Sequence, residues 1–305
     1  MFDQKSTHGA YFALSAYLFW GVVPIYFKWL SHVAPLEILI QRVLWSVVLL
    51  LGILAYTGQF DKLRVSRKKL ALLFCTALLL SMNWLIFIYA ILDNNIVETS
   101  LGYFINPLVS VFLGMIFLGE RLRPLQWMAI TIAASGILFQ LVYYGAIPWI
   151  ALGLAFSFGF YGLIRKNLNL HAIAGLTLET LLISPIALVG LFWLYSMGQL
   201  SFTNVDLKTD SLLVMTGFVT SFPLLCFAAA VTRLSLTAAG LFQYIAPSLS
   251  LVIAVLLYGE SFGFDKVITF SCIWLALVMF TAEALVHQRR ISNPLTAAFI
   301  ESKKT

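Results

Sequence analysis

The sequence predicts an all-α polytopic membrane protein of ten transmembrane helices, arranged as two inverted five-helix repeats. Three observations lead to this prediction: a very apolar composition, a series of long hydrophobic segments, and a match between the two halves of the chain. Hydrophobic residues make up 61% of the 305 residues, charged residues make up 10%, and the mean hydropathy is +0.95. Soluble domains are about half apolar and about one-quarter charged. The composition therefore fits a chain that lives in lipid, with little length left for a soluble domain.

Ten apolar segments are bounded by Gly, Pro, Asn or charged residues. A helix needs about 20 apolar residues to cross the hydrocarbon core, and backbone groups in lipid must be paired, so each segment is predicted to be helical. The first segment is too long for the apolar core of a secretory signal peptide, and we expect it to be retained. In chain order the segments are Gly9–Leu30, Pro35–Tyr56, Leu70–Leu92, Thr99–Leu118, Pro124–Tyr144, Ile147–Ile164, Ala174–Met197, Ser211–Val231, Thr237–Tyr258 and Phe264–His287.

The distribution of Lys and Arg predicts the orientation, because cytoplasmic loops are enriched in both residues. Fifteen of the 19 basic residues, Arg165 among them, fall on the side that the N-terminus shares, and only Lys208 and Lys266 fall opposite. Lys28 and Arg42 lie within or near the ends of spans. Both termini are therefore predicted to be cytoplasmic.

An internal repeat relates the two halves. Residues 102–120, GYFINPLVSVFLGMIFLGE, align with residues 242–260, FQYIAPSLSLVIAVLLYGE, at a constant offset of 140 that pairs Pro107 with Pro247 and Glu120 with Glu260. Each half then holds five spans, and an odd number inverts the second half, as is typical of secondary transporters. The predicted ranges are 1–145 for the first repeat, 146–288 for the second and 289–305 for a cytoplasmic tail.

The two helices related by this match carry polar residues beside a proline. Helical spacing places Tyr103 and Asn106 on one face next to Pro107, and Gln243 and Tyr244 lie next to Pro247. Each proline removes a backbone hydrogen bond, which either frees a carbonyl for solute or marks a plain packing kink. We expect these faces to line a central cavity near the middle of the membrane.

Ionisable residues within spans are functional candidates, because each costs at least about 2.5 kcal/mol at the bilayer centre. Arg42 is the best candidate for holding an anionic group. Glu37 and Glu179 are candidates for ion or proton coupling, although Glu179 fits a paired interface position equally well. Lys28 is expected to reach the outer interface.

The remaining candidates are an amide and several aromatic residues inside the spans. Asn83 suits a solute contact, but a buried amide also commonly hydrogen-bonds a neighbouring helix. Aromatic residues suit a pocket and also occur at membrane interfaces and helix seams. The predicted substrate-binding set comprises Arg42, Asn83, Trp84, Tyr103, Asn106, Gln243, Tyr244, Trp20 and Tyr161.

Enzymatic, metal and cofactor functions have no sequence support. The histidines lie near span ends, the three cysteines are far apart, and no HExxH, GxSxG or Walker sequence is found. The formal charge of +6 fits a basic rim that meets anionic lipid headgroups, so nucleic acid is not an expected partner. We expect no cofactor, no metal and no catalytic residue.

Several strings resemble one known family. FWGVVPIYFK from Phe19, RVLWS from Arg42, NWLIFIYA from Asn83, SLGYFINPLVSVFLGMIFLGERL from Ser100 and LGLAFSFGFYGLIRK from Leu152 are similar to the RarD group of the EamA-type drug/metabolite transporter superfamily. The resemblance covers residues 9–290 and implies two EamA repeats in a bacterial inner-membrane permease with a central cavity and alternating access. In the second half, Ala246 replaces the amide of Asn106 and GESF replaces GERL, so the halves are expected to differ in role.

Together these features predict a secondary transporter that moves a small metabolite or drug-like solute, as an exporter or exchanger, with amino acids and related metabolites among the candidates. The expected partners are this solute and membrane lipids. The alternative is a non-transporting membrane scaffold or sensor, which has no need for matched polar faces in both halves.

Overall fold

The computed structural model describes residues 4–92, 96–145, 148–258 and 263–292, and within these ranges the regular elements are all helical. One short 3-10 helix, η1, lies between the second and third α-helices. The elements are α1 (Gln4–Trp29), α2 (Pro35–Thr57), η1 (Phe60–Leu63), α3 (Arg67–Leu92), α4 (Ile96–Leu118), α5 (Pro124–Tyr144), α6 (Trp149–Leu168), α7 (Ala172–Ser196), α8 (Leu207–Val231), α9 (Leu236–Phe242), α10 (Ile245–Tyr258) and α11 (Phe264–Ser292).

Six of these helices contain stretches long and apolar enough to cross a membrane by length and composition. The stretches are Ser6–Trp29, Pro35–Thr57, Arg67–Phe87, Pro124–Tyr143, Ala172–Ser196 and Leu207–Val231, and shorter apolar stretches cover Gly102–Leu118 and Val267–Phe280. Large apolar side chains also point outward, such as Phe192 at 72% exposure. Lipid covers such surfaces, so the fold is that of a multi-pass membrane protein. The number of ten spans stays a prediction.

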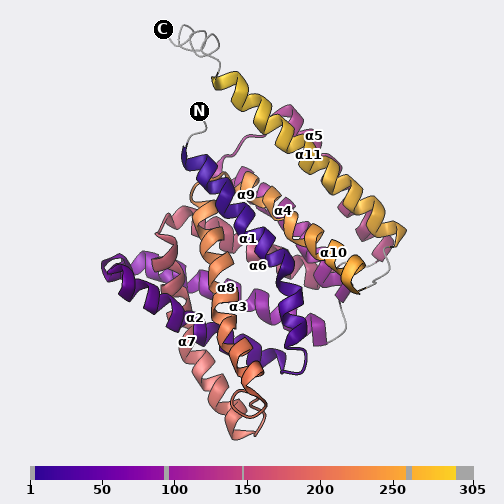
Figure 1. Ribbon diagram of the computed structural model, residues 1–305. Coiled ribbons are helices and arrows are strands. Elements are labelled where there is room, and N and C mark those ends of the chain that lie inside the picture. Colours follow the sequence, from indigo (N-terminus) through magenta and orange to yellow (C-terminus); the bar gives the residue numbers. More distant parts are fainter. Residues whose placement is uncertain (1–3, 93–95, 146–147, 259–262, 293–305) are drawn as a thin grey trace.

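The helices of the two halves pack chiefly against each other. In the first half, α1 contacts α8 and α10, α2 contacts α7 and α8, α3 contacts α6 and α7, and α4 contacts α6 and α9. The pair formed by α5 and α11 lies along one edge of the bundle, as Figure 1 shows. Gln126 of α5 donates a 3.1 Å hydrogen bond to Glu283 of α11, and Arg123 forms an ion pair with the same carboxylate. The two halves are therefore interlocked.

The ninth predicted segment, Thr237–Tyr258, is divided into two helices, so the prediction of one continuous helix there is wrong. Gln243 and Tyr244 separate α9 from α10. Pro247 removes one helical hydrogen bond there, because it has no N–H to donate to the carbonyl of Gln243 four residues earlier. Pro107 lies at the matching position, yet α4 continues through it. The proline pair that marks the repeat thus has different local effects in the two halves.

Two carboxylates of the first half hold the connections of the second half at opposite ends of the bundle. Glu37 of α2 is fully buried and accepts hydrogen bonds from the backbone N–H groups of Ser201 and Phe202, between α7 and α8, at 2.8–3.0 Å. Glu120, after α4, accepts hydrogen bonds from the N–H groups of Leu236 and Thr237 at 2.6 and 2.8 Å. Both carboxylates accept hydrogen bonds from backbone N–H groups that have no acceptor within a helix.

Replacing Gly217 with alanine is expected to destabilise the protein. A Cβ atom at Gly217 of α8 would lie 2.6 Å from the backbone carbonyl carbon of Trp45 in α2, so the two helices would have to separate. We expect a cost of about 1–3 kcal/mol, the range for overpacking. The measurement is the apparent unfolding temperature in detergent. Gly52→Ala is the matched control, because no atom lies within 4 Å of its added Cβ. Equal unfolding temperatures for the two variants would contradict this packing.

Removing the Glu37 carboxylate is expected to loosen the connection between α7 and α8. Glu37→Ala leaves the N–H groups of Ser201 and Phe202 without their acceptor, at a cost of about 2–4 kcal/mol for hydrogen bonds to a charged group. Limited proteolysis at this connection and the unfolding temperature measure the effect. Asp61→Ala, at an exposed position of η1, should change neither. If the Glu37→Ala variant resists proteolysis and heat as well as the parent protein does, Glu37 does not hold this connection.

Candidate functional site

A small cavity lies where two helices of each half meet. Its volume is about 20 Å³, and its walls come from α2, α3, α7 and α8. A cavity of this volume holds about one water molecule, so this conformation leaves no room there for a larger solute. The polar lining residues are Arg42, Ser46, Ser81, Glu179, Thr180 and Thr220. The cavity therefore presents one cationic and one anionic side chain.

Arg42 of α2 forms the cationic side of the cavity. Its guanidinium carbon lies 4.5 Å from the ring centroid of Trp84 in α3 and 5.4 Å from that of Phe27 in α1. The Nε group donates a 2.8 Å hydrogen bond to the Thr220 hydroxyl in α8. No carboxylate among the described residues lies within 4.0 Å of Arg42. Cation–π contacts stabilise the charge but leave guanidinium donors available for an anion.

Two tyrosines complete the surroundings of Arg42. Tyr26 and Tyr103 both lie within electrostatic range of its guanidinium. Tyr103 is 46% exposed and packs against Phe87 with their ring centroids 6.3 Å apart, whereas Tyr26 donates a hydrogen bond to the backbone oxygen of Leu212. The structure thus brings together three residues of the predicted set: Arg42, Trp84 and Tyr103.

Glu179 of α7 forms the anionic side. Its carboxylate accepts a 2.5 Å hydrogen bond from Thr76 of α3 and a 3.5 Å hydrogen bond from the Tyr161 hydroxyl of α6. Arg165 of α6 forms an ion pair with it, with Nη1 3.7 Å from Oε1, and both side chains are only 2% exposed. Arg165 is thus buried in an ion pair, and its predicted place on the side of the N-terminus stays a prediction. Of the two roles left open for Glu179, the structure shows the paired environment, and proton coupling stays a prediction.

Glu37 does not line the cavity. Its two carboxylate oxygens are occupied by the amide groups between α7 and α8, and no ion pair with Arg42 is found among the described residues. A coupling role for Glu37 stays a prediction, and the contacts that it makes are structural.

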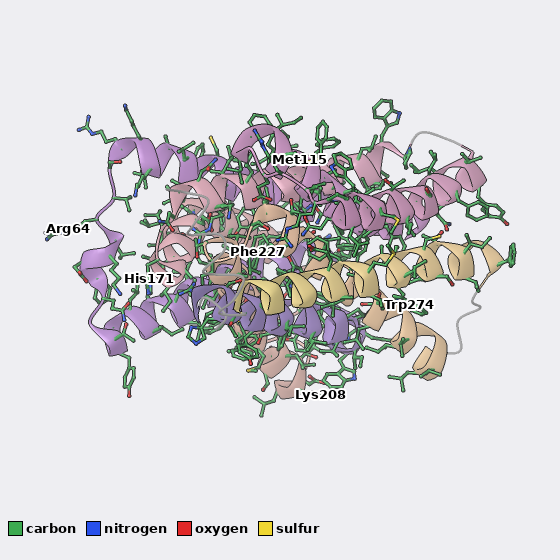
Figure 2. The ribbon with its side chains drawn as sticks, turned by 90° about the horizontal axis from the view of Figure 1, so that it is seen from above. Arg64, Met115, His171, Lys208, Phe227 and Trp274 are labelled. Carbon is green, nitrogen blue, oxygen red and sulfur yellow. The ribbon has the colours of Figure 1, made fainter. Side chains whose placement is uncertain are left out.

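Asn83 and Trp20 lie in helix contacts beside the cavity. The Asn83 amide donates hydrogen bonds of 2.9 Å to the Leu154 carbonyl and 3.0 Å to the Ser157 hydroxyl, which ties α3 to α6. Trp20 belongs to an aromatic cluster around Phe227, and the ring centroids of these two residues are 6.2 Å apart. Figure 2 shows Phe227 in the middle of the bundle. Tyr161 stacks on the same ring at 5.8 Å. These contacts match the structural alternatives for Asn83 and the aromatic residues.

The polar faces beside the two prolines meet each other instead of the cavity. Gln243, in the break between α9 and α10, donates a 3.0 Å hydrogen bond to Ser110 of α4. The buried carbonyl oxygen of Asn106 and the buried hydroxyl of Tyr244 have no hydrogen-bond partner among the described residues. This second polar region lies outside the cavity lining, so the predicted single site is divided in two.

Three contacts of the site were missed by the sequence analysis. Phe27 stacks under Arg42, Thr220 accepts its hydrogen bond, and Arg165 pairs with Glu179. Thr220 gives no signal, because threonines in apolar helices commonly bond their own backbone. Arg165 does give a signal in the sequence, because it lies four residues after Tyr161 and therefore shares a face of α6 with it.

The comparisons with known proteins agree with this architecture. The model of the EamA-like transporter family matches residues 7–142 and again residues 146–282. An uncharacterized transporter of Vibrio cholerae is 49% identical over 287 residues, which cover 93% of this chain and 95% of that protein. Protein RarD of Escherichia coli is 45% identical over 295 residues, covering 95% of this chain and all of that protein.

A solved crystal structure has the same fold. It superposes with a TM-score of 0.72 at 17% sequence identity and covers 92% of this chain and 99% of that chain. The sequence relatives and the family model confirm the resemblance that the motifs indicated. The chain therefore belongs to the EamA-like transporter family, within the RarD group of the drug/metabolite transporter superfamily.

Proposed function

We propose that this protein is a secondary transporter that moves a small solute across the bacterial inner membrane by alternating access, as an exporter or exchanger. The observation that carries the proposal is Arg42, a cation held at the wall of a small cavity with no carboxylate partner among the described residues. A charge inside a membrane bundle is costly and marks a solute or ion pathway. A scaffold or sensor has no need to keep such a charge unpaired.

The position of the cavity supports alternating access. Its walls are α2 and α3 from the first half and α7 and α8 from the second, so a movement of one half against the other changes the cavity directly. Solute sites at the interface of repeats are typical of secondary transporters. We propose ten spans in two inverted repeats, residues 1–145 and 146–288, which the two matches of the family model support.

The basic end of the bundle supports cytoplasmic termini. His171, between α6 and α7, has a pKa below its usual value because it is partly buried and because Lys62 and Arg233 lie nearby. These residues come from three separate connections, so the connections share one end of the bundle. Enrichment in Lys and Arg identifies that end as cytoplasmic in the proposed topology.

Transport by the purified protein in liposomes tests the proposal. A panel of metabolites, with amino acids included, is assayed by counterflow and under a proton gradient. Arg42→Gln is expected to slow transport by about 10- to 100-fold, the range for one lost hydrogen bond to a charged group. Arg64→Gln is the control, because Arg64 is exposed and lies at the edge of the bundle in Figure 2. No movement of any solute in the panel would overturn the proposal, and equal rates for the two variants would remove Arg42 from the site.

A further inference from the structure

The ion pair between Arg165 and Glu179 determines how much charge the cavity leaves unbalanced. The Arg165 guanidinium covers Gly175 of α7 so closely that a Cβ atom there would lie 2.0 Å from Nη1. Its Nε and Nη1 atoms are buried and have no hydrogen-bond partner among the described residues. The ionic contact with Glu179 is therefore the main compensation for this charge. The pair lies behind the cavity wall, because Glu179 lines the cavity and Arg165 does not.

The charges around the cavity do not cancel. Among the described lining residues only Arg42 and Glu179 are charged. Arg165 neutralises Glu179 from behind, and Thr76 and Tyr161 donate hydrogen bonds to it. The carboxylate of Glu37, at the start of α2, is occupied by backbone amides between α7 and α8. Arg42 keeps its charge with only a hydroxyl and aromatic rings around it. The result is one uncompensated positive charge.

From this balance, and on the basis of the proposed function, we propose that the site selects solutes with one net negative charge, and that Arg165 sets this selectivity by holding Glu179. A singly charged carboxylate that contacts Arg42 makes the cavity neutral, which removes the cost of an isolated charge in the membrane. A zwitterion of the same size brings an ammonium group whose natural partner, Glu179, is already occupied. Apolar walls from Val43, Leu80, Leu176, Ile183 and Leu224 suit an apolar body on the solute.

The test compares two probes that share a skeleton, 3-phenylpropanoate and L-phenylalanine, which differ only in the ammonium group. Binding of each radiolabelled probe is measured on the full-length protein in nanodiscs of bacterial lipids. We expect 3-phenylpropanoate to bind about 10- to 100-fold more tightly, the range for one interaction with a charged group. Arg64→Gln should bind both probes as the parent protein does, because Arg64 is exposed and outside the cavity lining.

Variants of the pair separate its role from general stability. Arg165→Gln frees Glu179, so the preference should shift toward L-phenylalanine by about tenfold. This variant leaves a buried carboxylate unpaired, which can prevent folding. The double variant R165Q/E179Q avoids that problem, and it should still bind 3-phenylpropanoate more tightly than L-phenylalanine, because Arg42 keeps its uncompensated charge. Glu179→Gln alone should widen the difference.

The inference is overturned if the parent protein binds L-phenylalanine at least as tightly as 3-phenylpropanoate, if it binds neither, or if the double variant loses the preference. None of these results touches the proposed function, which the metabolite panel in liposomes decides. If the protein transports only zwitterions, the proposed transport function holds and the proposed charge selectivity is wrong.

Discussion

Hydrocarbon offers no hydrogen bonds, and the rest of this structure follows from that constraint. Each polar group that enters the bundle must find its partner within the protein. Glu37 and Glu120 do so with backbone amides, Asn83 with α6, and Glu179 with Thr76, Tyr161 and Arg165. Most of these partners come from the opposite half, so polar pairing also helps to interlock the halves, whereas Tyr161 and Arg165 belong to the same half as Glu179. Among the described residues that line the cavity, Arg42 is the charged group that this pairing leaves uncompensated.

The helices themselves could be predicted from the sequence, because hydrophobic length is a local property. Short strings such as RVLWS from Arg42 and NWLIFIYA from Asn83 also led to the correct family before any contact was known. The break at Gln243 was harder to place. Pro107 and Pro247 look equivalent in the sequence, but only the second interrupts its helix. Whether a proline bends a helix or divides it depends on the neighbouring helices, and the sequence carries no direct record of those neighbours.

The site was only partly predictable for a related reason. Arg42 and Glu179 stand out because charges within apolar segments are rare. Their partners do not, since Thr220, Thr76 and Phe27 are ordinary residues of membrane helices and become informative only through contacts between distant segments. The burial of Arg165 was hidden for the opposite reason: it lies beside Lys166 at the end of a span, a pattern that usually marks a surface rim. Gly175 makes its burial possible by leaving space above α7.

The interlocking of the halves has a consequence for synthesis. The ribosome delivers α1–α5 to the membrane before α6–α11 exist, yet α2, α3 and α4 make most of their helix contacts with the second half. During that interval Glu37 and Asn83 lack the hydrogen-bond partners that they have in the finished protein, and Arg42 lacks Thr220. The first half therefore cannot complete its own core, and it must stay loosely packed, or in contact with the insertion machinery, until the last helices arrive.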